Sequence, residues 1–317
     1  MAHELEFVNG QACIAYAGQV PWHGLGVQVS NDLTPVQMLE AAGLDWRVNP
    51  IELFAEVGDE KLKTGHAALV RDSDNKVLDV ITDDWHPTQN IEAFEFFNDF
   101  VAAGEMEMHT AGSLRGGKIV WALAKTNESF ELFKGKDVID SYLHFTNSHQ
   151  YGKSIDVRST SIRVVCANTL TASLSQKSKN MVKVSHRRKF DADEVKLALG
   201  ISKQRLNQYK EVAEYLSKTR YKNEDIVDYF KRVFPLSDTS EKDMSKNARI
   251  AMDVMNTQPG AELGEGSFWQ LFNTTTYMVD HLIGRSVDTR LNSAWYGGGS
   301  VLKNEALKIA AKMAEVA

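Results

Sequence analysis

The sequence predicts an α+β fold in which an N-terminal mixed or antiparallel sheet with helices is followed by a mainly helical C-terminal part. Strand-like runs of alternating apolar and polar residues dominate up to residue 190, and runs with helical spacing dominate after it. The chain has 317 residues and is 43% apolar, so it can bury one large core or two ordinary ones. We expect a sheet domain over residues 1–190 and a helical region over residues 191–317 that packs on it.

The first elements are indicated by capping and turn residues. Thr34-Pro35-Val36-Gln37 has the pattern of a capping box with proline at the first helical position. Extended stretches follow, and two of them, HAALVRD and KVLDVIT, flank the turn Asp72–Asn75 as in a hairpin. A phenylalanine-rich run that ends at Gly104 predicts a helix with Phe94 and Phe97 in the core.

A second hairpin is predicted around the turn Arg115-Gly116-Gly117, with Trp121 inside the sheet on its second strand. The turn presents backbone amides together with two cations, Arg115 and Lys118, which is an arrangement suited to phosphate. An exposed turn with solvated charges is the alternative.

Strands continue to residue 190, and helices follow. Ile139–Thr146 and Ile155–Arg163 alternate like strands, and the second has polar residues on both faces. VVCANTLTASLS is typical of a helix or a helix-like crossover, and NMVKVSHRR of a further strand with cations. The expected helices lie around Val195–Arg220, Asn223–Phe234, Glu241–Asn256 and Ser267–Leu282, and from about Val301 to Val316 after the flexible turn Gly297–Gly299.

Positive charge is concentrated in the segment Lys153–Phe190, which we call the basic block. It holds nine Lys/Arg and one acid, or +8. The residues before it hold ten Lys/Arg and 23 Asp/Glu, or −13, and those after it 17 and 18, or −1, which together give the net charge of −6. The basic block therefore creates a local field that the net charge hides.

The cations of the basic block alternate with Ser, Thr and Asn, which are residue types that bind phosphate oxygens without reading sequence. Nearby aromatic residues, Tyr142, Phe145, Tyr151 and Phe190, offer faces on which bases stack. The candidate nucleic-acid-binding residues are Arg158, Arg163, Lys177, Lys179, Lys183, Arg187, Arg188 and Lys189, with Arg115 and Lys118 of the hairpin turn. The segment Lys177–Lys189 is the favoured contact, with Arg158 and Arg163 as floor residues. The alternative is that these cations neutralise the acidic N-terminal part, within the chain or across a subunit interface.

The familiar catalytic and cofactor motifs are absent. The sequence has no phosphate loop, dinucleotide fingerprint, H-E-x-x-H or G-x-S-x-G motif, and we expect no cofactor. His144 and His149 are the closest pair of histidines but lack a clear third ligand, so no metal site is expected. Cys13 and Cys166 make neither a disulfide framework nor a thiol zinc site.

No run approaches the length of a membrane span, and the first residues lack the layout of a signal peptide. The expected location is therefore the cytoplasm, with no membrane partner.

Three motifs resemble one family. Trp22-His23-Gly24-Leu25-Gly26, the run Arg163–Leu170, and a C-terminal run that begins at Ser267 are similar to the phage/plasmid-like family of domains of unknown function. The C-terminal run contains the family's Asn-x-x-Thr-x-x-x-Asp-His core, formed here by Asn273, Thr276, Asp280 and His281. The resemblance implies a protein of bacteriophages, prophages or conjugative plasmids in a bacterial cytoplasm, and it implies no established activity.

The spacing in that core places Asn273, Thr276 and Asp280 on one helix face, with His281 about 100° round from Asp280. Such a stripe either forms a satisfied buried network or lines a site.

We expect a protein that binds single-stranded DNA, or anneals it as a homo-oligomer, in replication or recombination. One alternative is an enzyme that acts on a nucleotide or phosphate substrate through Asp280 and His281. The other is an oligomeric interaction or counter-defence protein.

Overall fold

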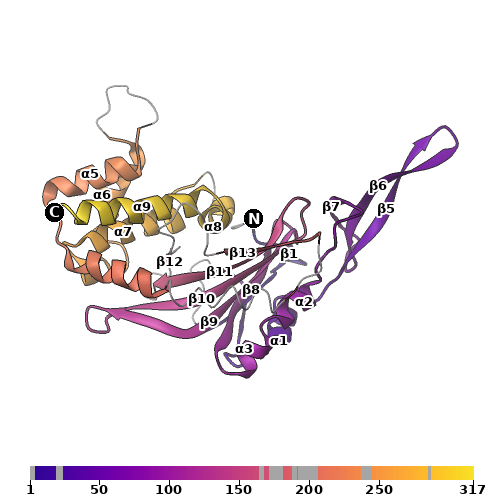
Figure 1. Ribbon diagram of the computed structural model, residues 1–317, viewed down its shortest axis with the longest axis horizontal. Helices are drawn as coiled ribbons and strands as arrows, with labels where there is room; N and C mark the ends of the chain where they lie inside the picture. The colour runs from indigo at the N-terminus through magenta and orange to yellow at the C-terminus, as the bar shows by residue number, and fades with distance from the viewer. Residues whose placement is uncertain are drawn as a thin grey trace. The chain divides into compact units, whose positions relative to one another are not determined.

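The computed structural model describes residues 4–18, 24–163, 168–170, 181–187, 191, 206–236, 244–284 and 287–317 (Figure 1). The α+β class is confirmed, with strands before residue 190 and mostly helices after it. The chain divides into two compact units, both made of segments distant in sequence. Unit one comprises Met1–Asn127, Tyr142–Ser159 and Met181–Gly200, and unit two comprises Glu128–Ser141, Thr160–Asn180 and Ile201–Ala317.

Within the described residues, the largest sheet has eight strands in the order β12-β11-β10-β9-β8-β3-β4, and β13 also pairs with β11. The β3–β4 pair is parallel, while β8 pairs antiparallel with both β3 and β9. Its strands are β3 (Ile14–Ala17), β4 (Val27–Val29), β8 (Met106–Leu114), β9 (Ile119–Leu132), β10 (Asp137–Ser148), β11 (Ser154–Arg163), β12 (Asn168–Leu170) and β13 (Met181–Ser185). Two short strands, β1 (Phe7–Val8) and β2 (Gln11–Ala12), form a separate pair.

A second sheet contains β5 (Val48–Val57), β6 (Glu60–Arg71) and β7 (Val77–Thr82), in that order and antiparallel throughout. The predicted hairpin of HAALVRD and KVLDVIT is β6 with β7, and is confirmed. The predicted hairpin around Arg115–Gly117 is β8 with β9, and Trp121 lies buried in the sheet as expected. A Cβ on Gly112 would lie 3.2 Å from the Trp121 ring, so glycine makes room for this indole.

Within its described residues, unit one contains three short helices. Helix α1 (Pro35–Ala41) begins at Thr34 with the predicted capping box, in which the Thr34 hydroxyl accepts from the amide of Gln37. The predicted phenylalanine-rich helix differs from the structure, which has α2 (Asn90–Glu95) and α3 (Asn98–Ala102) with a break between them. The break allows both Phe96 and Phe97 to place their rings within 6 Å of Phe145, although neighbours on a straight helix diverge by about 100°.

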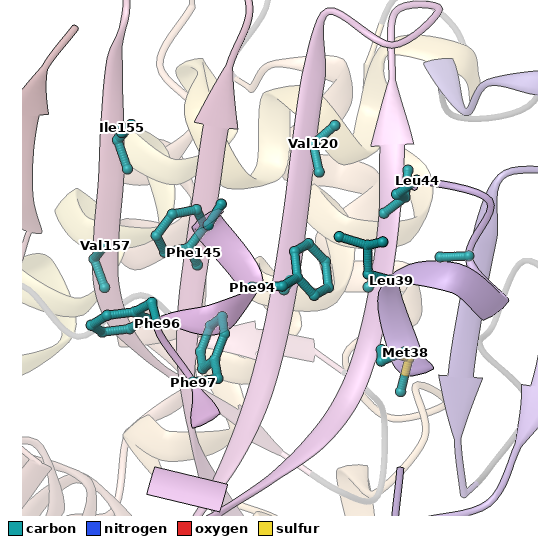
Figure 2. Packing of buried hydrophobic residues seen from close by; sticks show 14 of the residues in the cluster. Met38, Leu39, Leu44, Phe94, Phe96, Phe97, Val120, Phe145, Ile155 and Val157 are labelled. Atoms are coloured by element: carbon teal, nitrogen blue, oxygen red, sulfur yellow. The ribbon is translucent and has the colours of Figure 1, made fainter. Parts of the chain in front are cut away.

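The core of unit one lies on one face of the large sheet. Figure 2 shows Phe94, Phe96 and Phe97 lying over Val120 and Phe145 of the strands. All five side chains are buried, and burial of such a side chain contributes about 1.5–3 kcal/mol. The hydrophobic contact between α2, α3 and the sheet therefore accounts for much of the stability of this unit.

A buried ion pair lies at one end of this core. The Arg71 guanidinium donates to Glu6 at 2.7 Å, and both side chains are no more than 5% exposed. Arg71 also donates to both carboxylate oxygens of Asp74, and Ser113 donates to Glu6 at 2.6 Å. A Cβ on Gly117 would lie 2.5 Å from Arg71 Nη1, so the glycine lets the β8–β9 turn close over the pair.

Unit two is built from helices around the far ends of β9 and β10. Its core includes Phe130 and Ile139 from these strands together with the almost wholly buried helix α7. The Trp269 indole donates to Asp137 at 3.0 Å inside this core. Its helical segments are residues 206–218, α5 (Asn223–Val233), α6 (Lys246–Val254), η2 (Ala261–Gly264), α7 (Phe268–Tyr277), the π-helix η3 (Met278–Leu282), α8 (Val287–Tyr296) and α9 (Gly298–Ala314).

Two further expectations differ from the structure. The helix expected after Arg163 is replaced at Asn168–Leu170 by β12, which pairs antiparallel with Ser161–Arg163 at the end of β11. The other residues of the expected helix lie outside the described ones. The expected flexible turn Gly297–Gly299 instead begins α9. A Cβ on Gly299 would lie 2.9 Å from Val279 Cγ1, so this glycine is required by close packing.

Replacing Arg71 by methionine is expected to lower the free energy of unfolding by about 3–5 kcal/mol, because Glu6 would remain buried without its partner. Arg115→Met is the matched control. The Arg115–Glu4 pair is partly exposed, so its loss is expected to cost less than about 1 kcal/mol. Urea unfolding of both variants measures the difference, and equal small losses would contradict a structural role for the Arg71 pair.

Candidate nucleic-acid interface

The two ends of the basic block lie side by side in the large sheet. Strand β11 comes from its beginning and β13 from its second half, and they pair antiparallel from Ser154 opposite Ser185 to Arg158 opposite Met181. This register sets Lys183 directly opposite Asp156. Residues 23 to 31 positions apart therefore share one short stretch of sheet.

The pairing also fixes which side of the sheet these residues occupy. Ile155, Val157 and Val184 are buried in the core of unit one. Because side chains alternate along a strand, Asp156, Arg158 and Lys183 lie on the opposite side. We call this side of β11 and β13 the polar side.

Charged groups on or near the polar side have acidic neighbours. Arg158 is only 12% exposed and lies 3.6 Å from Asp156. Arg187, just after β13, is 65% exposed and lies 3.4 Å from Asp84. Lys183 is exposed. The interface thus offers accessible cations at the β13 end, while Arg158 is held in a more buried pair.

The other predicted contact residues are distributed as follows. In the β8–β9 turn, Arg115 is 40% exposed and donates to Glu4, and Lys118 is half-buried. No described side-chain contact joins either of these cations to β11 or β13. For Arg163 the structure describes the backbone, which pairs with Asn168. Four of the predicted residues lie outside the described ones: Lys177, Lys179, Arg188 and Lys189.

The aromatic residues proposed for base stacking differ in exposure. Phe145 is 1% exposed and Tyr142 is 5% exposed, so neither offers a free face. Tyr151, in the turn between β10 and β11, is 42% exposed, and its backbone amide donates to Asp79. Phe190 lies outside the described residues. Among the described aromatics considered, Tyr151 is the one suited to stacking.

His144 and His149 have separate surroundings. Burial and the nearby Arg158 charge hold the pKa of His144 well below its usual value, so its imidazole is neutral. His149 lies instead against Trp46, with ring centroids 5.3 Å apart, and donates from Nε2 to Asn90 Oδ1 at 2.9 Å. Among the described residues, no group of three or more His, Cys, Asp or Glu side chains could hold a metal ion.

The loop before α2 is the centre of a buried polar cluster in unit one. Gln89 exchanges hydrogen bonds with both backbone groups of Val48, and Asn90 donates to the Leu44 carbonyl at 3.0 Å. Asn147 donates to the Thr88 carbonyl at 2.9 Å. This loop therefore fastens α1, β5 and the end of β10 together.

Two histidines of this cluster are held neutral. His186 stacks on Trp85 with ring centroids 4.3 Å apart, and its Nδ1 lies 3.3 Å from the His86 carbonyl. Burial lowers the pKa of His186 to about 4 and that of His149 to about 3. Both rings are therefore uncharged at neutral pH, and they contribute packing and hydrogen bonds rather than positive charge.

In unit two, three residues of the Asn-x-x-Thr-x-x-x-Asp-His motif, Asn273, Thr276 and Asp280, are buried. Lys303 of α9 donates to Asp280 at 2.8 Å, and both side chains are buried. Asn273 donates to the Trp269 carbonyl, and Thr276 donates to the Asn273 carbonyl, so both amide and hydroxyl bind their own helix. Asn273 Oδ1 is buried without a hydrogen-bond partner among the described residues.

The ring of His281 lies 4.9 Å from that of Tyr277. The described contacts thus pair Asp280 with a lysine and set His281 against an aromatic ring. The π-helical turn that carries both is the remaining local signal of a functional site.

The thiol of Cys13 is also inert. Burial raises its pKa to about 11, so the reactive thiolate is scarce at neutral pH. Cys166 lies outside the described residues.

A family profile for a domain of unknown function, DUF932, matches residues 77–295, which is more than half of the chain. The chain belongs to the DUF932 family. No curated protein and no solved structure matches this chain. No helix in the described part of the chain is long and apolar enough to cross a membrane.

The DUF932 region takes in both candidate sites. It begins at Val77, the first residue of β7, and so contains β11 and β13. It also contains Asp280, whereas the partner Lys303 lies beyond its end. The family match thus agrees with the expected membership of a family of domains of unknown function, and it indicates no activity.

Lowering the pH from about 6.5 toward about 4 is expected to destabilise the protein. In that range an unfolded His186 or His149 takes up a proton that the folded form excludes, so the stability that is full above pH 6.5 is lost as pH falls. The slope reaches about 1.4 kcal/mol per pH unit for each group. Urea unfolding at pH 7 and pH 5 measures it. His186→Asn should make the dependence shallower, and an unchanged dependence would contradict this account.

Lys303→Met is expected to lower the free energy of unfolding by about 3–5 kcal/mol, because Asp280 would be left buried and unpaired. Lys308→Met is the control on the same helix, since the Lys308–Glu305 pair is more exposed and its loss should cost less than about 1 kcal/mol. Thermal and urea unfolding compare them. If Lys303→Met is as stable as the control, the pair has no structural role.

Proposed function

We propose that this chain binds single-stranded nucleic acid along the polar side of β11 and β13. The observation that carries the proposal is the β11–β13 pairing, which brings the two ends of the basic block together. Lys183 and Arg187 are exposed there, and Ser154 and Ser185 stand opposite each other on the same side. Cations with neighbouring hydroxyls are the groups that bind phosphate oxygens without reading sequence.

The acidic neighbours do not prevent this binding. The Arg187–Asp84 pair is exposed on both sides, with 65% and 60% of the side chains accessible. An exposed ion pair contributes only about 0–1 kcal/mol, so a phosphate can replace Asp84 at little cost. Arg158 is less available, because its pair with Asp156 is largely buried. We therefore assign the direct phosphate contacts to Lys183 and Arg187, and to Arg158 a contribution to the local positive potential without direct contact.

Single strands are favoured over duplex because of Tyr151. Its exposed ring lies in the turn before β11, and Lys153 follows two residues later and is also exposed. A base can stack on such a ring, which contributes about 1–3 kcal/mol, only when it is released from a duplex. The expected ligand is thus a flexible strand that combines phosphate contacts with stacking.

The biological setting follows from the resemblance to phage/plasmid-like proteins. On that basis we propose that the chain acts on single-stranded DNA in the replication or recombination of a phage or plasmid in a bacterial cytoplasm. A homo-oligomer would bind one DNA strand along the polar sides of several copies of the chain, as annealing requires. The α+β fold class is compatible with this role.

The proposal is tested by fluorescence anisotropy with a labelled single-stranded oligonucleotide at two or more salt concentrations. Each phosphate contact contributes about 0.7 to the slope of log affinity against log salt, so Lys183→Ser with Arg187→Ser should reduce that slope by about 1.4. Tyr151→Ala should weaken binding by about tenfold or more without changing the slope.

Lys61→Ser with Lys63→Ser is the control, because both lysines are about 70% exposed on a different sheet. This variant removes the same charge and should bind as the wild type does. Wild-type affinity that ignores salt, or an equal loss in the control and the test variant, would sink the proposal.

A further inference from the structure

The β5–β6 hairpin forms a ribbon whose outer part has no packing partner in the described chain. The strands pair from Val48 opposite Arg71 to Val57 opposite Glu60, and Gly58 begins the two-residue turn at φ 61°. Strand β7 pairs only with the inner residues His66–Val70, so the outer part is two-stranded (Figure 1). Side chains of residues 49–66 are exposed, except that Leu53 is half-buried.

The two sides of this ribbon differ in chemistry. Side chains alternate along β5, so Ile51, Leu53, Ala55 and Val57 lie on one side and Glu52, Phe54 and Glu56 on the other. The charged side is internally neutralised, since Lys63 lies 2.5 Å from Glu52 and Lys61 lies 4.0 Å from Glu56. The register places Leu62 opposite Ala55, on the first side.

The apolar side continues across the three-stranded sheet. Ala68 pairs with Ile51 and Val80, and Val70 pairs with Val77, so these residues share one side. The reverse of the inner sheet carries Val48, Ala67, Leu69 and Ile81, which are already buried in the core of unit one. We call the apolar residues of the open side the apolar face: Ile51, Leu53, Ala55, Val57, Leu62, Ala68, Val70, Val77 and Val80. Polar residues, including Asn49, His66 and Glu60, also lie on this side.

The apolar face is largely open to solvent, although Ala68 is buried. Ile51, Val57 and Val77 are 52%, 60% and 53% exposed, and Leu62 and Val80 are 48% and 44% exposed. A contiguous apolar surface of this kind marks an interaction site, and a two-stranded ribbon in water is only marginally stable by itself. A covering partner would therefore stabilise this face by removing its apolar side chains from water.

The chemistry of the face selects among partners. Residues 49–66 hold four acids and two lysines, so nucleic acid is repelled rather than attracted. Edge pairing through β5 is also unfavourable, because Pro50 lacks an amide donor and antiparallel pairing of two β5 strands would bring Glu52 and Glu56 of both copies close together. Contact through the face itself avoids both penalties.

A second copy of the chain fits this face. In a two-fold contact each residue meets residues of the same patch, so any charge in the patch faces a like charge. The apolar residues themselves carry none, and the acid on this side, Glu60 opposite Val57, lies at its outer end. We propose that two copies associate face to face through the apolar face, as two sheets pack in a sandwich. This association needs no nucleic acid and stands apart from the proposed function.

The test is the mass of the full chain in solution, measured by light scattering after nuclease treatment, over a wide range of concentration. The wild type should approach twice the chain mass of 35.4 kDa as concentration rises. Val57→Glu with Leu62→Glu should raise the dissociation constant by roughly tenfold or more, because like charges would then meet in the contact. Phe54→Ser, on the charged side of the same ribbon, should leave it unchanged.

A mixing experiment separates this effect from misfolding. Val57→Glu and Val57→Lys should each associate more weakly than the wild type and retain the wild-type circular dichroism spectrum. A mixture of the two should associate more strongly than either variant alone, because the new charges are opposite. A wild type that is monomeric throughout once nucleic acid is removed would overturn the proposal. So would an assembly that survives Val57→Glu with Leu62→Glu.

Discussion

Unit one depends on neutralising a guanidinium that folding takes out of water. Arg71 is 3% exposed, and the several kcal/mol lost on burying its charge are offset by Glu6, Asp74 and the ring of Trp46, whose centroid lies 5.0 Å away. Asp74 is a local partner three residues away, whereas Glu6 and Trp46 come from distant parts of the chain, so the full set of contacts forms only when those parts meet. The glycine at the β8–β9 turn is required for the same reason, since a side chain there would collide with the guanidinium.

Elements set by neighbouring residues could be predicted from the sequence, whereas contacts between distant residues could not. Thr34, the turn Asp72–Asn75 and the Arg115–Gly117 turn act through local backbone chemistry, and each formed the element expected. Long-range partners left no such signal: nothing in the spacing of Glu6 and Arg71 indicates that they meet. Gly299 was misjudged because three successive glycines are typical of a flexible turn, whereas here the close approach of Val279 selects the glycine.

The candidate interface shows a similar limit. The charge of the basic block could be counted, but its distribution over the sheet depends on the β11–β13 register. That register separates an accessible Lys183 from a largely buried Arg158. The β-strand character of Asn168–Leu170 was missed for a related reason, since local composition favoured a helix and only pairing with β11 favours a strand.

The chain passes repeatedly between its two units, because the far ends of β9, β10 and β11 belong to unit two and their near ends to unit one. Phe130 and Ile139 are strand residues that only the later helices bury. A fragment that ends at residue 190 would expose them, and neither unit can be cut out at one point in the sequence. During synthesis the N-terminal strands must wait for the C-terminal helices, so the protein should fold slowly.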